Sequence, residues 1–400
     1  MFRITAEDGG ARLGRLETPH GAVETPAFVV VGTDARVRCL EPEDIPGTKT
    51  QIIIANTFHL WRSLGDVGLA DFPGLHEEMG WQGPIMTDSG GFQVFSMGAA
   101  REFGVGKVGR TAPTLRNDSE VGVPTAERVG KNLVRVTDSG VYFREGNEEV
   151  YLDAELSMRI QEQLGADIIF AFDEPSSPLH DYAYTKTAME RTHAWAKRSL
   201  EAKESAQQIF GIVQGGLFED LRKESAKIIA SLPFDGFGIG GAFGSSFGSK
   251  EEDTFRALSW ITPFLPKEKP RHLLGIGKIA DIFQAVEMGM DTFDCVVPTR
   301  EARHGSLWTA NGRFDITKGK YAEDESALVE GCSCLACGGG LTKKALYELF
   351  KSKNPEAGRL ATIHNVYFFN GLMEEIRSSI RERRFAAFKK EYLSALNNRA

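Results

Sequence analysis

Eight short apolar runs, separated by stretches with helical periodicity, are the feature that most constrains the fold of this 400-residue chain. They cover residues 27–32, 51–56, 84–88, 167–173, 209–214, 236–241, 272–277 and 291–295. Near-continuous apolar strands are typical of a parallel sheet that is buried on both faces. Residues 152–165 and 278–289 have the apolar spacing of amphipathic helices, and each segment ends at a glycine. The alternation predicts an α/β fold, and eight strands favour a (β/α)8 TIM barrel over an open sheet.

Three regions interrupt this alternation. The first thirty residues have the turn signals of a small N-terminal β-meander. Residues 98–150 are rich in glycine and charge and contain a predicted hairpin at 133–144, so we expect them to pack over the barrel mouth or to form a lid. Residues 305–370 form a cysteine-bearing insert, and an amphipathic C-terminal helix follows it.

Composition is that of an ordinary protein without membrane spans. No run approaches the roughly 18 apolar residues of a membrane span, and the N-terminus lacks an apolar signal region, so a cytoplasmic location is expected. The net charge of −8 argues against a general nucleic-acid coat protein. It does not argue against a local basic footprint, and residues 377–390 carry six Lys or Arg side chains. A solvated helix face explains that run equally well.

Cysteine spacing predicts a metal site in the insert. Cys332, Cys334 and Cys337 supply three sulfurs within six residues, and His364 could supply an imidazole. Such a set makes a closed tetrahedral zinc site with a structural role, one ion per chain. Reduced cysteines on a surface turn are the plainer alternative, and a disulfide is less expected. We therefore predict a zinc-binding subdomain at 305–370, near the last helix, and a catalytic barrel formed by 1–304 and 371–400.

Three of the apolar runs deliver an aspartate at their C-terminal end, namely Asp88, Asp173 and Asp294. Parallel strands share one rim at their C-terminal ends, so these carboxylates can meet in one pocket. A single aspartate in such a position is more often a helix N-cap or a turn former. The three together predict an active site.

The neighbouring rim positions are also polar. The expected rim set is Asn56, Asp88, Ser89, Gln93, Asp173, Gln214, Gly240, Gly241 and Asp294. Carboxylates accept N–H groups, while glutamine and exposed amides can read a carbonyl, which suits a guanine-like ring. Phe92 and Leu274 could sandwich a flat base, or could equally belong to the core. Lys278, Arg300 and Arg303 are cations that could hold phosphates.

The motifs resemble those of the tRNA-guanine transglycosylases, also called queuine tRNA-ribosyltransferases, in their bacterial-type branch. The resemblance runs from about residue 10 to about residue 390. It includes Asn56-Thr-Phe-His-Leu, Thr87-Asp-Ser-Gly-Gly-Phe-Gln-Val-Phe-Ser, Phe172-Asp-Glu, Gly211-Ile-Val-Gln-Gly-Gly, Leu274-Gly-Ile-Gly, Phe293-Asp-Cys-Val-Val-Pro-Thr-Arg and the cysteine cluster. The family's fold is a TIM barrel with an inserted zinc subdomain, and its members usually act as homodimers. They are pentosyltransferases that replace the wobble guanine of GUN anticodons with a 7-deazaguanine, in queuosine modification of tRNA.

The resemblance implies a role for each rim residue. Asp294 would be the nucleophile that attacks C1′ of the flipped-out nucleotide, and Asp88 would move protons as general acid and base, supported by Asn56 and Gln93. Asp173 would accept the ring N–H groups, and Gln214 and the Gly241 amide would read the carbonyl. Phe92 and Leu274 would stack on the base. Lys278, Arg300 and Arg303 would contact the anticodon loop.

Two departures bear on the choice of base. Pro175 follows Asp173-Glu174, at the position where the bacterial pattern has cysteine. The loop 242–248 carries no acidic residue, and the first acid after it is Glu251. An incoming 7-aminomethyl-7-deazaguanine would lack a partner for its ammonium group there, which tilts the expectation towards queuine. A noncatalytic tRNA-binding partner subunit is the main alternative, although such a chain would be expected to have lost Asp294 or Asp88. A metal-dependent barrel hydrolase is a third interpretation, which the lack of a His-x-His pattern at the strand ends disfavours.

Overall fold

The computed structural model describes residues 1–91, 134–145, 148–240 and 251–397. Its centre is a closed barrel of eight parallel strands in the order β4-β5-β6-β10-β11-β12-β13-β14, with β14 paired to β4. The strands are β4 (Ala27–Val31), β5 (Ile53–Ala55), β6 (Ile85–Thr87), β10 (Ile168–Phe170), β11 (Gln208–Val213), β12 (Gly236–Ile239), β13 (Arg271–Leu273) and β14 (Thr292–Asp294). Every one of the eight apolar runs overlaps one of these strands, so the predicted TIM barrel is confirmed.

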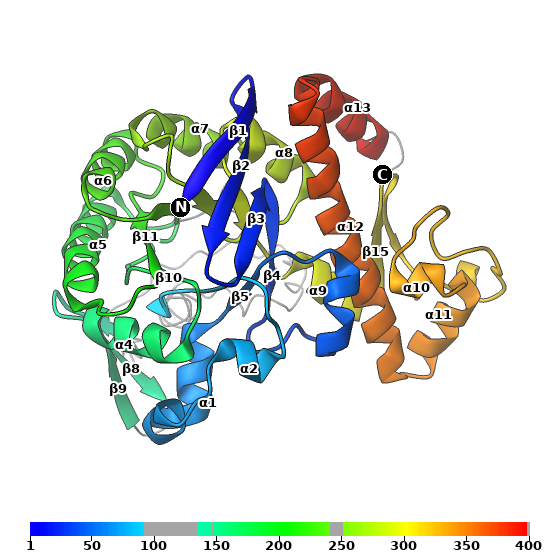
Figure 1. Cartoon of the computed structure of the whole chain (residues 1–400), viewed down its shortest axis with the longest axis horizontal. Helices are drawn as coiled ribbons and strands as arrows, with labels where there is room; N and C mark the ends of the chain where they lie inside the picture. Colours follow the sequence, from blue (N-terminus) through cyan, green and yellow to red (C-terminus); the bar gives the residue numbers. More distant parts are fainter. Residues whose placement is uncertain (92–133, 146–147, 241–250, 398–400) are drawn as a thin grey trace, which may run out of the picture.

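Helices surround the barrel as the alternation predicts (Figure 1). They are α1 (Thr57–Ala70), α2 (Leu75–Met79), α4 (Ala154–Leu164), α5 (Tyr182–Ala202), α6 (Glu219–Ser231), α7 (Glu251–Ile261), α8 (Ile279–Glu287) and α9 (Val297–Arg303). The predicted helix at 152–165 is α4, which Asp153 caps through the amide of Leu156 at 2.8 Å, and the one at 278–289 is α8. The outer face of the barrel strands and the inner faces of these helices share one large apolar core. No helix in the described part of the chain is long and apolar enough to span a membrane.

The N-terminal meander closes one end of the barrel. Strands β1 (Phe2–Asp8), β2 (Ala11–Thr18) and β3 (Gly21–Thr25) form an antiparallel sheet that lies across the barrel in Figure 1. Phe2, Leu16 and Val23 of this sheet belong to the same apolar cluster as Ile168 and other side chains of the barrel strands. The meander therefore fills the barrel from the end at which the strands begin, and leaves the opposite rim to the loops.

The long segment before α4 is described only in part. Strands β7 (Val134–Val136), β8 (Val141–Glu145) and β9 (Glu148–Leu152) form a small antiparallel sheet. The first two are the predicted hairpin, with Val134 opposite Phe143. Residues 98–133 and 146–147 of the predicted lid lie outside the described residues, as do Phe92 and Gln93 before it.

The cysteine-bearing insert projects beside the barrel (Figure 1). It contains β15 (Ser306–Thr309), β16 (Gly312–Asp315), α10 (Leu335–Gly338) and α11 (Lys343–Lys351), with a small apolar cluster of its own that includes Leu307, Leu328 and Leu346. Helix α12 (Pro355–Arg381) crosses the boundary predicted at residue 370, packs on α9 and takes the place of the last barrel helix. Helix α13 (Phe385–Asn397) ends the described chain.

Candidate active site

Each described rim residue lies where its barrel strand ends. Asn56 and Asp88 follow β5 and β6 directly, Asp173 lies three residues past β10, and Gln214 and Gly240 follow β11 and β12. Leu274 follows β13, and its amide donates to the carbonyl of Ile239 at 3.3 Å, while Asp294 is the last residue of β14. The structure thus brings these residues to one end of the barrel. Phe92, Gln93 and Gly241 lie outside the described residues.

Asp88 is held by donors from the start of helix α1. The Asn56 Nδ2 group donates to its Oδ2 at 2.6 Å, and the amide of Thr57 donates to its Oδ1 at 3.0 Å. The amide of Gly90 donates to the same Oδ1 at 3.1 Å. Asn56 is itself the N-cap of α1, because its Oδ1 accepts from the amide of His59 at 2.9 Å. A helix cap therefore fixes the carboxylate in position.

Asp173 is a buried acceptor at the centre of a polar cluster. Ser89 donates its hydroxyl to Oδ1 at 2.9 Å, and the Gln214 Nε2 group donates to Oδ2 at 2.7 Å. Burial raises the pKa of Asp173 to about 6, although the hydrogen bonds from Gln214 and Ser89 oppose the shift. The Gln214 Oε1 atom is buried and has no hydrogen-bond partner among the described residues. A buried polar atom without a partner costs about 1–3 kcal/mol, so a ligand that satisfies this amide would be favoured here.

Asp294 has different surroundings. Its side chain is 17% exposed, and its Oδ1 accepts from the amide of Gly275 at 3.0 Å and lies 3.1 Å from His272 Nε2. Gly275 has a φ of +76°, a conformation that favours glycine and that turns its N–H toward the carboxylate. One oxygen of Asp294 is thus anchored from within the barrel.

Two of the three predicted cations lie on the helix that follows Asp294. Arg300 and Arg303 belong to α9, and Lys278 is the exposed N-cap residue of α8. The pKa of Arg303 is lowered, first by burial and then by the nearby positive charges of Arg38 and Arg300. Arg38, from the loop after β4, was not identified from the sequence. A group of like charges of this kind would be stabilised by phosphate groups.

Three of the six basic residues in the C-terminal run, 377–390, make intramolecular contacts. Arg377 donates to the carbonyl of Pro26 at 2.8 Å, and Lys389 pairs with Glu287 at 2.7 Å. Arg384 pairs with Glu382. The first two contacts tie α12 and α13 to neighbouring elements, whereas the Arg384 pair is local and exposed, as are Arg381, Arg383 and Lys390.

The structure adds two buried residues that the sequence did not single out. His272 is the polar residue inside an apolar strand, which was the only signal available in the sequence. Arg222 of α6 is fully buried and donates to the carbonyls of Gly216, Val213 and Gly240 at 2.7, 3.1 and 2.8 Å. It thereby ties the end of β11 to the end of β12. Burial lowers the pKa of Arg222 to about 9.

The predicted zinc ligands converge in the insert. The Sγ atoms of Cys332, Cys334 and Cys337 lie 3.6, 3.8 and 3.5 Å from His364 Nδ1. Tetrahedral zinc, with bonds of about 2.3 Å to sulfur and about 2.05 Å to nitrogen, requires a separation of roughly 3.6 Å. His364 Nε2 lies 2.8 Å from the carbonyl of Trp308, a contact that orients the ring as in known metal sites. The four residues can hold a metal ion and fit zinc.

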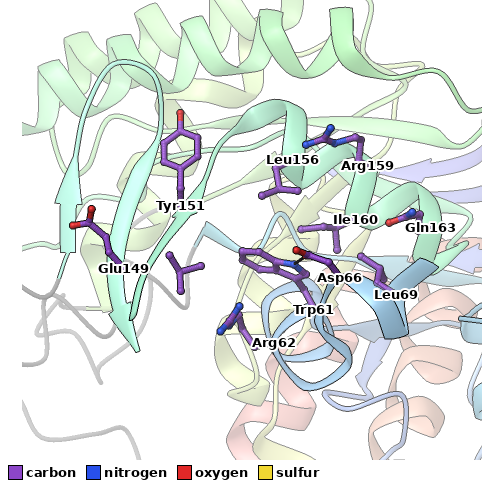
Figure 2. Close-up of a pocket in the computed structure, with 11 residues that line it drawn as sticks. Trp61, Arg62, Asp66, Leu69, Glu149, Tyr151, Leu156, Arg159, Ile160 and Gln163 are labelled. Atoms are coloured by element: carbon purple, nitrogen blue, oxygen red, sulfur yellow. Dashed lines mark hydrogen bonds between the residues drawn. The ribbon is translucent and has the colours of Figure 1, made fainter. Parts of the chain in front are cut away.

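A pocket of about 630 Å³ lies away from this rim, between α1, β9 and α4. Figure 2 shows Trp61 beside Asp66 at its centre, and the indole N–H donates to Asp66 at 3.1 Å. None of the predicted site residues lines it. The strand ends remain the candidate active site.

Comparison with known proteins decides the family. The family model described as queuine tRNA-ribosyltransferase matches residues 7–398. The chain belongs to the queuine tRNA-ribosyltransferase family. This family of pentosyltransferases includes a protein of Archaeoglobus fulgidus named putative queuine tRNA-ribosyltransferase, which is 43% identical over 98% of both chains. A queuine tRNA-ribosyltransferase of Staphylococcus aureus is 40% identical over 97% of this chain and 94% of its own.

Family membership agrees with the resemblance found in the sequence. It also fits the polar side chains of the rim, where the buried Asp173 carboxylate accepts from the Gln214 amide and a second carboxylate, Asp294, ends β14. Within the described residues, the two side-chain groups able to hold a metal are the cysteine cluster and His20, His76 and Asp167. Asp167 precedes β10, at the opposite end of the barrel.

Proposed function

We propose that this family member exchanges the wobble guanine of GUN-anticodon tRNAs for a 7-deazaguanine by double displacement. The observation that carries the proposal is the contrast between two carboxylates on one rim. Asp173 is buried and hydrogen-bonded as an acceptor, while Asp294 is partly open to solvent and anchored through one oxygen. The first suits the N–H edge of guanine, and the second suits attack on a sugar carbon.

In the first displacement an oxygen of Asp294 attacks C1′ of the flipped nucleotide and forms an ester-like bond to the ribose. The C1′–N9 bond breaks with its electron pair, and Asp88 supplies the proton that neutralises the departing guanine. In the second displacement Asp88 takes the proton from the incoming base, whose nitrogen attacks C1′ and releases Asp294. Two displacements at one carbon retain its configuration.

Asp173 and Gln214 would recognise the base in both steps. Asp173 would accept from the ring N–H and the exocyclic amine, and the Gln214 amide would bind the carbonyl, as would the backbone amide of Gly241. Ser89, Gly240, Leu274, Phe92 and Gln93 complete the proposed base site. The unpartnered Oε1 of Gln214 is an acceptor that suits an N–H of the base, while the base carbonyl would bind the second hydrogen of Nε2, whose first is donated to Asp173.

The proposed partners follow from the charges and from the family. The cluster of Arg38, Arg300 and Arg303, together with Lys278, supports binding of the anticodon-loop phosphates. One structural zinc ion is proposed for Cys332, Cys334, Cys337 and His364. We also propose a cytoplasmic homodimer. The incoming base is proposed to be queuine, because the loop 242–248 offers no acid to the ammonium of 7-aminomethyl-7-deazaguanine.

The nucleophile can be tested by replacing Asp294. Radiolabelled guanine should be incorporated into unmodified tRNA by the wild-type enzyme, and Asp294→Ala should abolish incorporation, because no covalent intermediate can form. Asp294→Ala should retain the wild-type thermal transition, since the side chain is partly exposed. Full incorporation by this variant would refute the assignment. Incorporation by the wild-type enzyme also distinguishes the enzyme from a noncatalytic partner subunit.

The choice of base requires a competition assay. Enzyme and tRNA are offered queuine and 7-aminomethyl-7-deazaguanine together, and the modified nucleosides are quantified after digestion. Preferential incorporation of queuine is expected. Equal use of both bases would remove the proposed preference.

A further inference from the structure

His272 is an ionisable side chain in the interior of the barrel. It lies on β13, is 0% exposed, and pairs in parallel register with Thr292 of β14. Its Nδ1 lies 2.9 Å from the Thr292 hydroxyl oxygen and its Nε2 lies 3.1 Å from Asp294 Oδ1. Its ring also packs against Phe170 at a centroid distance of 5.5 Å. Two strands thus hold one imidazole against the carboxylate at the rim.

The partners of His272 assign its hydrogen atoms. A carboxylate only accepts hydrogen bonds, so Nε2 must carry the hydrogen that it shares with Asp294. The hydroxyl of Thr292 can donate to Nδ1 when that nitrogen carries no hydrogen, so the two partners together fit the tautomer with its hydrogen on Nε2. His272 therefore acts toward Asp294 as a hydrogen-bond donor.

This donor makes the two oxygens of Asp294 unequal. Oδ1 is held by both His272 Nε2–H and the amide of Gly275. Oδ2 has no hydrogen-bond donor among the residues that the structure describes, and the side chain is partly exposed. An oxygen without donors keeps its lone pairs available for attack.

We propose that His272 is a positioning residue that fixes Asp294 so that Oδ2 is the oxygen that attacks C1′. The inference rests on the proposed function, in which Asp294 is the nucleophile. In the first displacement an electron pair of Oδ2 forms the bond to C1′, and the pair of the C1′–N9 bond leaves with guanine. In the second, the pair of the Oδ2–C1′ bond returns to the carboxylate. The charge that then develops on Oδ1 is received by the two N–H donors, and His272 transfers no proton.

Paired substitutions test this role. Gln at position 272 can offer its amide nitrogen near the place of Nε2, whereas Asn offers its own near the place of Nδ1. We expect His272→Phe and His272→Asn to lower kcat by about 10²-fold, the usual effect of losing one such donor. KM for tRNA and for the base should stay within about twofold, because His272 is not proposed to contact either. His272→Gln should recover most of kcat, and Thr292→Val should give an intermediate loss because the tautomer is no longer fixed.

A second measurement follows the step itself. The covalent tRNA–enzyme species is quenched at short times and resolved on a denaturing gel, and its rate of formation should fall in parallel with kcat. The matched control is His76→Gln, because His76 also lies beside a buried carboxylate, Asp167, but at the opposite end of the barrel. That variant should keep the wild-type kcat. Thermal transitions establish that each variant is folded.

The possible outcomes separate this inference from the function on which it rests. A wild-type enzyme without guanine exchange, or with its covalent bond on a residue other than Asp294, overturns both. An active wild-type enzyme with unchanged kcat in His272→Phe overturns the role of His272 alone. The role of His272 is also overturned if the substitutions change KM but not kcat, or if His272→Gln and His272→Asn recover kcat to the same extent. If His272→Phe does not fold, the role of His272 is tested by kcat in the other variants. It is then overturned if His272→Gln and His272→Asn have equal kcat, or if Thr292→Val has the wild-type kcat.

Discussion

Asp173 and Asp294 are the same residue type in opposite surroundings, and the difference is made by their neighbours. Asp173 is buried with two side-chain donors, so it is suited to bind N–H groups, whereas Asp294 is anchored on one oxygen and open on the other side. The sequence predicted both positions, because each follows an apolar run. It could not predict that His272 contacts Asp294, or that Arg222 ties the end of β11 to the end of β12, since one lies within a strand and the other on the buried face of a helix.

The raised pKa of Asp173 predicts a pH dependence of base binding. Below about pH 6 the side chain becomes protonated and no longer accepts from two N–H groups, so KM for guanine should rise as the pH falls through this range. Asp173→Asn should give a high KM that no longer changes with pH there. Steady-state kinetics between about pH 5 and about pH 8 measure both. A flat wild-type KM would contradict the assignment.

The raised pKa of Asp173 also makes the free energy of unfolding depend on pH. The folded-state pKa lies above the unfolded value, so the folded protein binds the proton more tightly than the unfolded chain. The contribution of Asp173 to stability should therefore decrease as the pH rises from about 4 to about 6. Urea denaturation of wild type and Asp173→Asn across this interval measures the difference, and the opposite slope would contradict it.

At the scale of elements, the alternation of strands and helices was sufficient to predict the barrel, and the cysteine spacing was sufficient to predict a metal site. The position of α12 was not predictable, because this one long helix packs against both the cysteine-bearing insert and the barrel. Its first half supplies His364 to the cysteine cluster, and its second half packs on the barrel. The helix has buried residues along its whole length, so its sequence pattern shows no break at residue 370.

Loss of the proposed zinc should destabilise the insert and leave the barrel folded. Cys334→Ser removes one of four ligands, and structural zinc in small domains contributes about 10–16 kcal/mol to folding. We expect loss of the metal by elemental analysis and faster proteolysis between residues 305 and 354. The matched control is Cys39→Ser, which replaces an exposed free cysteine. Full zinc content with unchanged proteolysis in Cys334→Ser would count against the site.

At the scale of the whole molecule, the meander and the barrel are joined by a buried ion pair. Arg12 of β2 donates from Nε to Asp291 Oδ1 at 2.8 Å and from its other nitrogens to the carbonyls of Lys267 and Lys269. Burial raises the pKa of Asp291, although Arg12 acts in the opposite direction. Asp291 directly precedes β14, so this ion pair links the N-terminal meander to the strand that carries Asp294.

Breaking this pair should be costly. Arg12→Met leaves the Asp291 carboxylate buried without its cation, and a loss of about 3–5 kcal/mol in the free energy of unfolding is expected. Arg12→Met combined with Asp291→Asn should recover part of the loss. Arg15→Met removes a neighbouring arginine whose ion pairs are exposed, and it should change stability little. Chemical denaturation of the four proteins measures these values, and equal effects at positions 12 and 15 would contradict the prediction.

The sequence by itself determined the barrel, the rim positions of three aspartates and the ligands of the metal cluster, because strand periodicity and residue spacing are local properties. The tertiary structure decided which atoms face one another. Only folding places His272 and Gly275 on the same oxygen of Asp294, and only folding closes Ser89 and Gln214 around Asp173. Hydrogen bonds between residues far apart in the chain depend on the register of the barrel strands and on the paths of the loops, which a single sequence does not record.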